Sequence, residues 1–336
     1  MIARAAVLAL AACLPARVLA QVLTPAEARD SSRASLVRDV TYLASKELAG
    51  RATGTPGNDS AAVFISRRYL SLQIDPGMKT TQCDSTGACA HTYFQKFRTP
   101  MPTLRDTLAE TDALAHNVVA IIPGTDSALE GEWIVVGAHY DHLGQTGVGA
   151  MDRATATAPH LGADDNASGT AAVLELALRL AAAPLRRSVM FVHFGAEEIG
   201  LVGSTVFVAN SPMPVDSITA MVNLDMVGHL GRGRLQLFGL QSAPEWRSLV
   251  ARANETDRMG VLPFDDLGLD GSGSDHERFF RAGVPVIHLF TGTHRAYHTK
   301  DDTVEIVDFD GLVRVVDFAE RLIRVIGDDP FKPFRR

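Results

Sequence analysis

Short apolar runs that alternate with helical patterns constrain the fold of this chain more than any other feature. The runs are rich in Val, Ile and Phe and show little apolar–polar alternation, which is typical of strands covered on both faces of a sheet. We expect such strands at residues 117–122, 133–137, 188–194, 218–224, 234–238 and 284–290. Helical patterns occur at residues 25–48, 60–72, 169–183, 245–255 and 311–326. Strands that alternate with helices predict an α/β fold with helices on both faces of the sheet.

The composition is that of an ordinary globular protein. Of the 336 residues, 46% are hydrophobic and 21% are charged, which excludes a disordered or fibrous chain. The formal net charge is -7 and the sequence has no long Lys/Arg run, so we do not expect nucleic acid as the main partner.

The first 20 residues have the pattern of a secretory signal peptide. A positive start containing Arg4 precedes an apolar run at residues 5–12, and small residues come before Gln21. That run is shorter than the roughly 20 residues a membrane span needs, and no other stretch is long and apolar enough. We expect residues 1–20 to be a signal peptide and residues 21–336 one domain of an exported monomer, periplasmic or secreted. A lipid anchor on Cys13 is the alternative, since the residues before it resemble a lipobox, but the leader is short for one.

After cleavage of that leader, Cys83 and Cys89 are the remaining cysteines. They flank a turn-rich segment, and in an exported protein such a pair predicts a disulfide. A metal site is the weaker alternative because no second Cys/His pair lies nearby.

The candidate functional residues follow the expected strands, where ligands bind in α/β folds. His139 and Asp141 come just after the strand at 133–137 and are two residues apart, so their side chains lie on one side of the chain. A metal-bound His139 needs a partner that fixes its tautomer, and Asp141 can supply one. Taken alone, a structural role for His139 is the commoner case.

Two consecutive aspartates, Asp164 and Asp165, precede the helix at 169–183. Helix capping explains Asn166 or Ser168 but does not need two aspartates as well. Because a carboxylate has two oxygens with which it can bridge two cations, we expect Asp164 to be shared between two ions.

Glu197 and Glu198 follow the strand at 188–194. Adjacent carboxylates repel each other unless a cation is near, and one can bind a metal while the other moves a proton. Asp225 stands at the end of the strand at 218–224, where a helix cap or a turn is the alternative explanation.

His298 comes shortly after the strand at 284–290, and we expect it to be a metal ligand. His294 lies four residues earlier, a spacing that binds one metal only on a helix. Gly292 and the polar surroundings indicate a loop, so we expect His294 to be solvated.

Together these residues have the composition of a two-metal hydrolytic site. Oxygen and imidazole ligands without thiolates suit zinc, and less often manganese or cobalt. Glu197 remains as a spare carboxylate beside the expected ligands, which are His139, Asp164, Glu198, Asp225 and His298.

In this order the motifs resemble those of the M28 family of zinc peptidases. The resemblance extends over residues 35–327, and residues 43–57 are similar to the N-terminal region common in bacterial members. It implies a mixed, mostly parallel central β-sheet flanked by helices, the zinc-dependent exopeptidase (phosphorylase/hydrolase-like) fold. The motifs that carry it are His139–Asp141, residues 162–169, residues 196–200, residues 223–225 and His298 with Thr299.

The resemblance also implies a role for each candidate residue. One zinc would be held by His139 and Asp225, and the other by Glu198 and His298. Asp164 would bridge the two ions and be followed by a cis peptide bond to Asp165. Glu197 would be the general base for a metal-bound water, and Asp141 would orient His139. Tyr297 is a candidate for stabilising the oxyanion.

The function implied is that of an exported two-zinc exopeptidase, an aminopeptidase that hydrolyses the N-terminal residues of peptides. Carboxypeptidases, dipeptidases and the one-zinc glutaminyl cyclases are alternatives on the same fold. A related family, M20, is disfavoured because there is little room for its dimerisation domain. A non-catalytic binding protein is disfavoured because Glu197 and the five expected ligands are all present.

Overall fold

We describe the protein from a computed structural model, which covers residues 24–100, 112–145, 149–152, 158–231, 233–255, 264–266 and 273–329. The expected signal peptide at residues 1–20, with Cys13, lies outside the described residues. No helix in these described ranges is long and apolar enough to cross a membrane.

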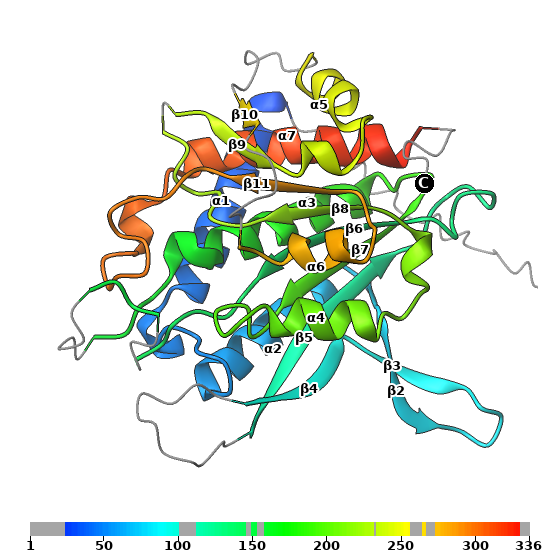
Figure 1. Cartoon of the computed structure of the whole chain (residues 1–336), viewed down its shortest axis with the longest axis horizontal. Helices are drawn as coiled ribbons and strands as arrows, with labels where there is room; N and C mark the ends of the chain where they lie inside the picture. The colour runs from blue at the N-terminus through cyan, green and yellow to red at the C-terminus, as the bar shows by residue number, and fades with distance from the viewer. Residues whose placement is uncertain are drawn as a thin grey trace, which may run out of the picture.

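A mixed sheet forms the centre of the described structure (Figure 1). Its four central strands, in the order β7-β6-β8-β11, are parallel, whereas β5 runs antiparallel to β7 and β9 runs antiparallel to β11. The predicted fold class is therefore confirmed. The strands in spatial order are β1 Asp75–Pro76, β5 Asp112–Ile122, β7 Ser188–Phe194, β6 Trp133–His139, β8 Ile218–Leu224, β11 Val286–Phe290, β9 Leu235–Phe238 and β10 Phe264–Asp266, with β4 Phe94–Pro100 paired to β5.

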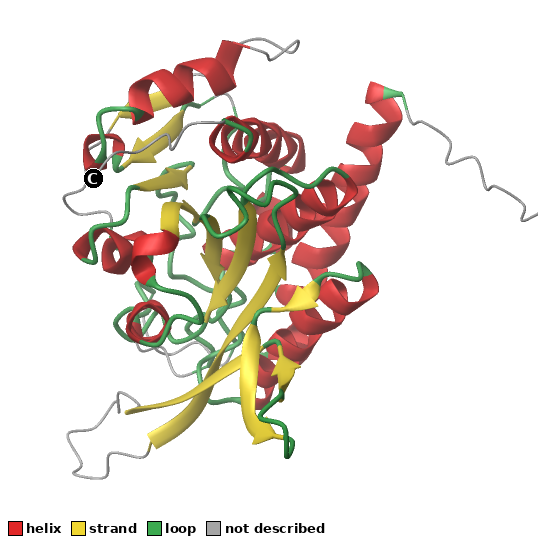
Figure 2. Ribbon diagram, turned by 90° about the vertical axis from the view of Figure 1, so that its right-hand side faces the viewer, coloured by secondary structure: helices red, strands yellow, loops and turns green. Residues whose placement is uncertain are grey.

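Helices cover both faces of this sheet (Figure 2). One face carries the longer helices: α1 Pro25–Leu43, α2 Pro56–Ser71, α3 Gly169–Ala182 and α7 Phe309–Gly327, with α5 Trp246–Glu255 packed against α7. The other face carries the shorter helices α4 Val202–Ala209 and α6 His276–Arg281. The order of strands and helices along the chain agrees with the predicted alternation.

The central strands are apolar throughout because each of their faces lies in a separate apolar core. Successive side chains of a strand point to opposite faces of the sheet. In β6, Val136 packs into the core beneath the longer helices, and its neighbour Val135 packs into the core beneath α4 and α6. In β7, Phe191 and Val192 divide in the same way. A strand that is buried on both sides has no polar face, which explains the absence of alternation in the sequence.

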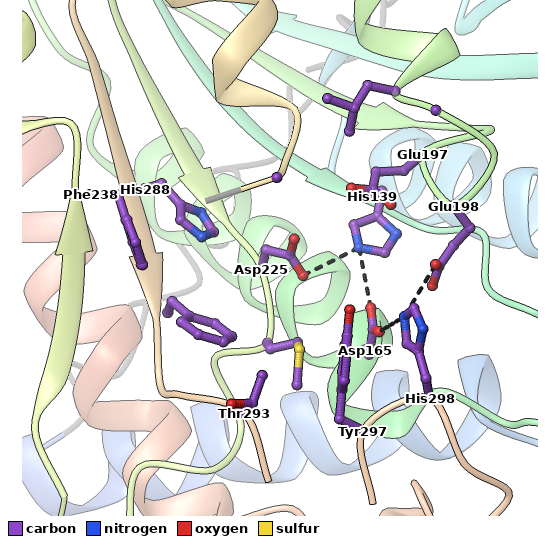
Figure 3. Close-up of a pocket in the computed structure, with 15 residues that line it drawn as sticks. His139, Asp165, Glu197, Glu198, Asp225, Phe238, His288, Thr293, Tyr297 and His298 are labelled. Atoms are coloured by element: carbon purple, nitrogen blue, oxygen red, sulfur yellow. Dashed lines mark hydrogen bonds and ion pairs between the residues drawn. The ribbon is translucent and has the colours of Figure 1, made fainter. Parts of the chain in front are cut away.

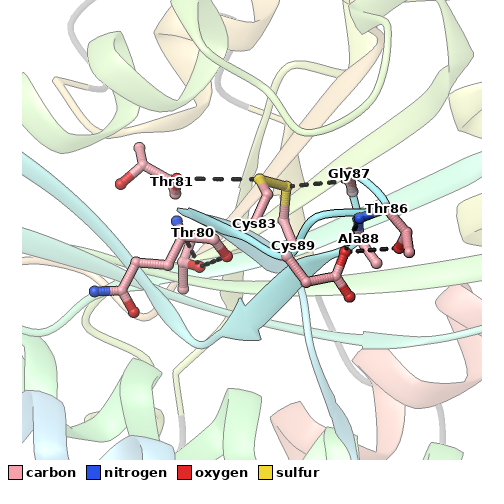
Figure 4. Close-up of a disulfide and its surroundings, with 9 residues drawn as sticks. Thr80, Thr81, Cys83, Thr86, Gly87, Ala88 and Cys89 are labelled. Atoms are coloured by element: carbon pink, nitrogen blue, oxygen red, sulfur yellow. Dashed lines mark hydrogen bonds between the residues drawn. A yellow bond between two sulfur atoms is a disulfide. The ribbon is translucent and has the colours of Figure 1, made fainter.

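A disulfide joins Cys83 and Cys89, as predicted (Figure 4). The two cysteines are paired opposite each other at the end of a hairpin formed by β2 Met78–Cys83 and β3 Cys89–Thr92. The Asp84 carboxylate accepts hydrogen bonds from the backbone N–H groups of Thr86 and Ala88 and so closes the turn between the strands. This small sheet is separate from the central one.

Candidate metal centre

A cavity of about 450 Å³ opens at the carboxyl ends of the central strands (Figure 3). His139 is the last residue of β6, Asp225 directly follows β8, and Glu197 and Glu198 lie in the loop after β7. Asp165 reaches the cavity from the turn before α3. Parallel strands end at one edge of the sheet, so residues far apart in the sequence meet here.

Asp165 stands between two sets of side chains (Figure 3). On one side, His139 Nε2 lies 3.3 Å from Asp165 Oδ1 and 3.2 Å from Asp225 Oδ1. On the other side, His298 Nε2 lies 3.1 Å from Asp165 Oδ2 and 3.3 Å from Glu198 Oε2. Each oxygen of the Asp165 carboxylate therefore faces a different set.

Asp164, which we expected in this cluster, points away from it. Its Oδ1 accepts hydrogen bonds from the backbone N–H of Gly228 at 2.7 Å and from Ser168 Oγ at 3.0 Å. Its Oδ2 lies 3.1 Å from His294 Nε2. The structure therefore places Asp165 in the cluster where we expected Asp164. The expected cis bond is wrong by one residue, since it joins Asp165 to Asn166. His294 is not a solvated residue, since its side chain is 7% exposed and lies against Asp164.

The carboxylate of Asp302 explains which aspartate enters the cavity. It is fully buried and accepts the backbone N–H of Asp164 at 2.8 Å and that of Asp165 at 3.0 Å. This bridge fixes the turn so that the Asp164 side chain lies against Gly228 and the Asp165 side chain faces the cavity. Burial, together with the nearby Asp164, raises the pKa of Asp302 to about 6.

The residues fit zinc. At Zn–N and Zn–O distances of roughly 2.0–2.1 Å, the ligand atoms of a tetrahedral zinc site lie about 3.3 Å apart. The separations between the histidine nitrogens and the carboxylate oxygens of the two sets are 3.1–3.3 Å. Among the described residues, His139, Asp165 and Glu198 are close enough to share an ion, and so are His139, Glu197 and Asp225.

Burial and crowded charge set the protonation of the cluster. Burial raises the pKa of Glu197 well above its ordinary value, and the carboxylates of Glu198 and Asp275 add to this effect. Burial acts in the same direction on Asp165, but hydrogen bonds from His139 and His298 outweigh it and hold the pKa of Asp165 well below its ordinary value. Carboxylates crowded in this way are stabilised by cations.

Asp141 contacts the cluster through its own main-chain carbonyl and through the backbone of the loop after β7. Its main-chain carbonyl lies 3.2 Å from His139 Nδ1, whereas its carboxylate, which we expected there, is 3.9 Å from that nitrogen. The carboxylate instead accepts the backbone N–H groups of Glu197 at 3.0 Å and Glu198 at 3.4 Å, and the hydroxyl of Thr53 at 3.0 Å. Asp141 therefore fixes the loop that carries the two glutamates.

The sequence patterns did not reveal the role of Arg51, which connects the segments beneath the cluster. Its guanidinium is fully buried and donates hydrogen bonds to the carbonyls of Tyr140 at 2.9 Å, Leu161 at 2.6 Å and Gly162 at 2.9 Å, and also to that of Leu43. Tyr140 follows His139, and Gly162 begins the turn of Asp165. The one sequence feature that pointed to Arg51 was its position within residues 43–57, the segment that resembles the N-terminal region of bacterial family members.

We expect Arg51→Lys to lower the free energy of unfolding by about 3 kcal/mol, because one ammonium cannot reach four carbonyls and each buried unsatisfied group costs roughly 1–3 kcal/mol. Denaturant unfolding of the apoprotein measures this loss. The matched control is Arg67→Lys at an exposed position of α2, where the change should stay within about 0.5 kcal/mol. Equal stability of the two variants would contradict the connecting role of Arg51.

Carboxylates and imidazoles gathered at the carboxyl edge of an α/β sheet form the kind of centre that metal-dependent hydrolases use. The sequence profile of peptidase family M28 matches residues 117–323, and the chain belongs to this family. The predicted family is confirmed.

The sequences of individual relatives are also similar to this chain. The chain is 31% identical over 228 residues to a probable leucine aminopeptidase of Trichophyton verrucosum, covering 63% of this chain and 57% of the relative. It is 33% identical over 170 residues to aminopeptidase YwaD of Bacillus subtilis, covering 47% of this chain and 36% of the relative. The matches thus span about half or less of these relatives' own lengths.

Two solved structures share the fold. BSAP, a zinc aminopeptidase from Bacillus subtilis, superposes with a TM-score of 0.65 at 17% identity, over 88% of this chain and 95% of that chain. A Porphyromonas gingivalis glutaminyl cyclase superposes with a TM-score of 0.67 at 20% identity, over 88% of this chain and 97% of that chain.

Proposed function

We propose that the protein is a two-zinc aminopeptidase. The observation that carries this proposal is the Asp165 carboxylate, each of whose oxygens faces a separate set of ligand atoms. In this proposal His139 and Asp225 would hold one ion, Glu198 and His298 would hold the other, and Asp165 would take the shared place first assigned to Asp164. Zinc bound there would polarise the scissile carbonyl and acidify the attacking water.

The side chains that line the cavity bear on which end of a peptide it can bind. Four carboxylates line it, and none of the described lining residues is Lys or Arg. Two zinc ions would offset the charge of these carboxylates, so the support for an aminopeptidase is that a C-terminal carboxylate would find no cationic side chain here. Aminopeptidase is also the printed name of the relatives given above.

Apolar side chains also line the cavity. Phe238 lies on the side away from Glu198 and His298 (Figure 3), and Leu201, Met226 and Phe290 are further apolar lining residues. An apolar lining of this kind supports an apolar side chain on the residue to be removed.

Glu197 is proposed as the general base. It lines the cavity with its carboxylate close to His139 and Asp225, and its backbone N–H is bound by the Asp141 carboxylate. Its carboxylate would take a proton from the attacking water and then give it to the leaving amine, a task for which a raised pKa is suited. Burial also raises the pKa of Tyr297, so its phenol stays protonated and can donate a hydrogen bond to the developing oxyanion.

We also propose that the chain is exported as a monomer and that residues 21–336 form a single domain. The leader pattern supports export, and so does the disulfide between Cys83 and Cys89, because disulfides persist in oxidising compartments.

The proposed function is tested with aminoacyl p-nitroanilides before and after removal of metal. We expect hydrolysis of substrates with a free α-amine, little hydrolysis of their N-acetylated forms, loss of activity after dialysis against a chelator, and recovery on adding zinc. Hydrolysis that survives complete removal of metal would overturn the metal-dependent mechanism. Release of ammonia from N-terminal glutamine, without peptide hydrolysis, would assign a cyclase instead.

A further inference from the structure

His142 lies against the metal centre but belongs to neither set of expected ligands. Its side chain is fully buried, and its Nδ1 lies 2.7 Å from Glu198 Oε1. The other oxygen of the same carboxylate, Oε2, lies 3.3 Å from His298 Nε2. The two oxygens of Glu198 thus have different neighbours.

The short separation indicates a hydrogen bond and not two ligands of one ion. Ligand atoms on a tetrahedral zinc lie about 3.3 Å apart, whereas 2.7 Å is a charge-assisted hydrogen-bond distance. A carboxylate can only accept, so the proton must be on His142 Nδ1. Among the described residues, His142 Nε2 is buried without a hydrogen-bond partner, which also favours the Nδ1–H tautomer.

The ring of His142 has little freedom to move. The backbone of Gly162 approaches it so closely that a Cβ at that position would lie 2.5 Å from His142 Cγ and Cδ2. The ring of His298 packs edge-on against it, with ring centroids 5.8 Å apart. The His142 backbone N–H is bonded to the carbonyl of Arg51. A donor fixed in this way can impose an orientation on Glu198.

We propose that His142 is a positioning residue that occupies Glu198 Oε1 and leaves Oε2 as the oxygen offered to the second zinc. Glu198 then cannot readily chelate this ion with both oxygens, and room on the ion is kept for substrate. This inference rests on the proposed two-zinc function. It gives a role to His142, to which none of the expected ligand motifs assigned one.

The test compares His142→Leu, which removes the donor, with His142→Asn, whose amide nitrogen can replace Nδ1–H. Zinc affinities are measured by competition with a chelator. We expect His142→Leu to lower the affinity of the second site for zinc by about 10–100-fold, because hydrogen-bond partners of metal ligands typically contribute this much to metal affinity. The affinity of the first site should be unchanged. His142→Asn should restore most of the affinity. The control is His193→Leu, which removes a buried histidine bonded to Tyr69 outside the site and should leave both affinities unchanged.

Cobalt in the second site provides a readout independent of activity. We expect weaker visible absorption in His142→Leu than in the wild type, because absorption falls as Glu198 binds with both oxygens and the coordination number rises. Thermal unfolding of the apoproteins ensures that folded chains are compared, and His142→Ala replaces the Leu variant if that one does not fold. Unchanged affinity and spectrum in the donor-free variant, or equal losses in the Leu and Asn variants, would overturn the role of His142. A wild-type chain that binds only one zinc would instead overturn the proposed function.

Discussion

Glu197→Gln is expected to lower kcat by about 10²–10⁴-fold, the usual contribution of a general base. The amide has nearly the same shape but cannot accept the proton of the attacking water. The backbone position of residue 197 should persist, because the Asp141 carboxylate binds its N–H and not its side chain. Steady-state kinetics on an aminoacyl p-nitroanilide measures the loss, and metal analysis should show an unchanged zinc content.

A matched control for this variant is Glu130→Gln, an exposed glutamate in the loop before β6. Its kcat should equal that of the wild type. If Glu197→Gln retained wild-type turnover with both zinc ions bound, Glu197 could not be the base.

Replacing the two consecutive aspartates separately should affect zinc content and activity differently. Asp165→Asn removes the carboxylate that faces both ligand sets, so we expect this variant to lose zinc. Its activity should fall by more than roughly 100-fold, the upper end of the loss for residues that only hydrogen-bond to a metal ligand. Asp164→Asn keeps an oxygen that can accept the N–H of Gly228. We expect it to retain both zinc ions and most of the activity.

Metal content and kcat/KM of the two variants, measured side by side, decide between the aspartates. Asp164→Asn can lower stability by about 1–3 kcal/mol through altered buried hydrogen bonds, and a denaturant titration detects this effect separately. Zinc loss in Asp164→Asn together with full zinc in Asp165→Asn would restore the assignment made from the sequence.

Most of the central sheet could be predicted from the sequence, because burial on both faces leaves an uninterrupted apolar run. The strands at 188–194 and 218–224 agree with β7 and β8 to the residue. In contrast, β4 at the side of the sheet alternates buried and exposed residues, and β1 has only two residues. Neither has the continuous apolar pattern from which the other strands were predicted.

The kinds of residue in the site could be predicted from their positions after the strands, but contacts between distant segments could not. The choice of Asp165 over Asp164 depends on the carboxylate of Asp302, more than 130 residues away. Arg51 likewise acts through the carbonyl of Gly162, 111 residues further along the chain. His142 had a local signal, since it follows His139 by three residues, but its partner Glu198 is again distant in sequence.

The most direct test of the two-zinc centre is an anomalous difference map, recorded at the zinc absorption edge from a crystal of the zinc-loaded protein. We predict two peaks on either side of the Asp165 carboxylate, one beside His139 and Asp225 and the other beside Glu198 and His298. A single peak, or a peak beside Asp164, would contradict this account.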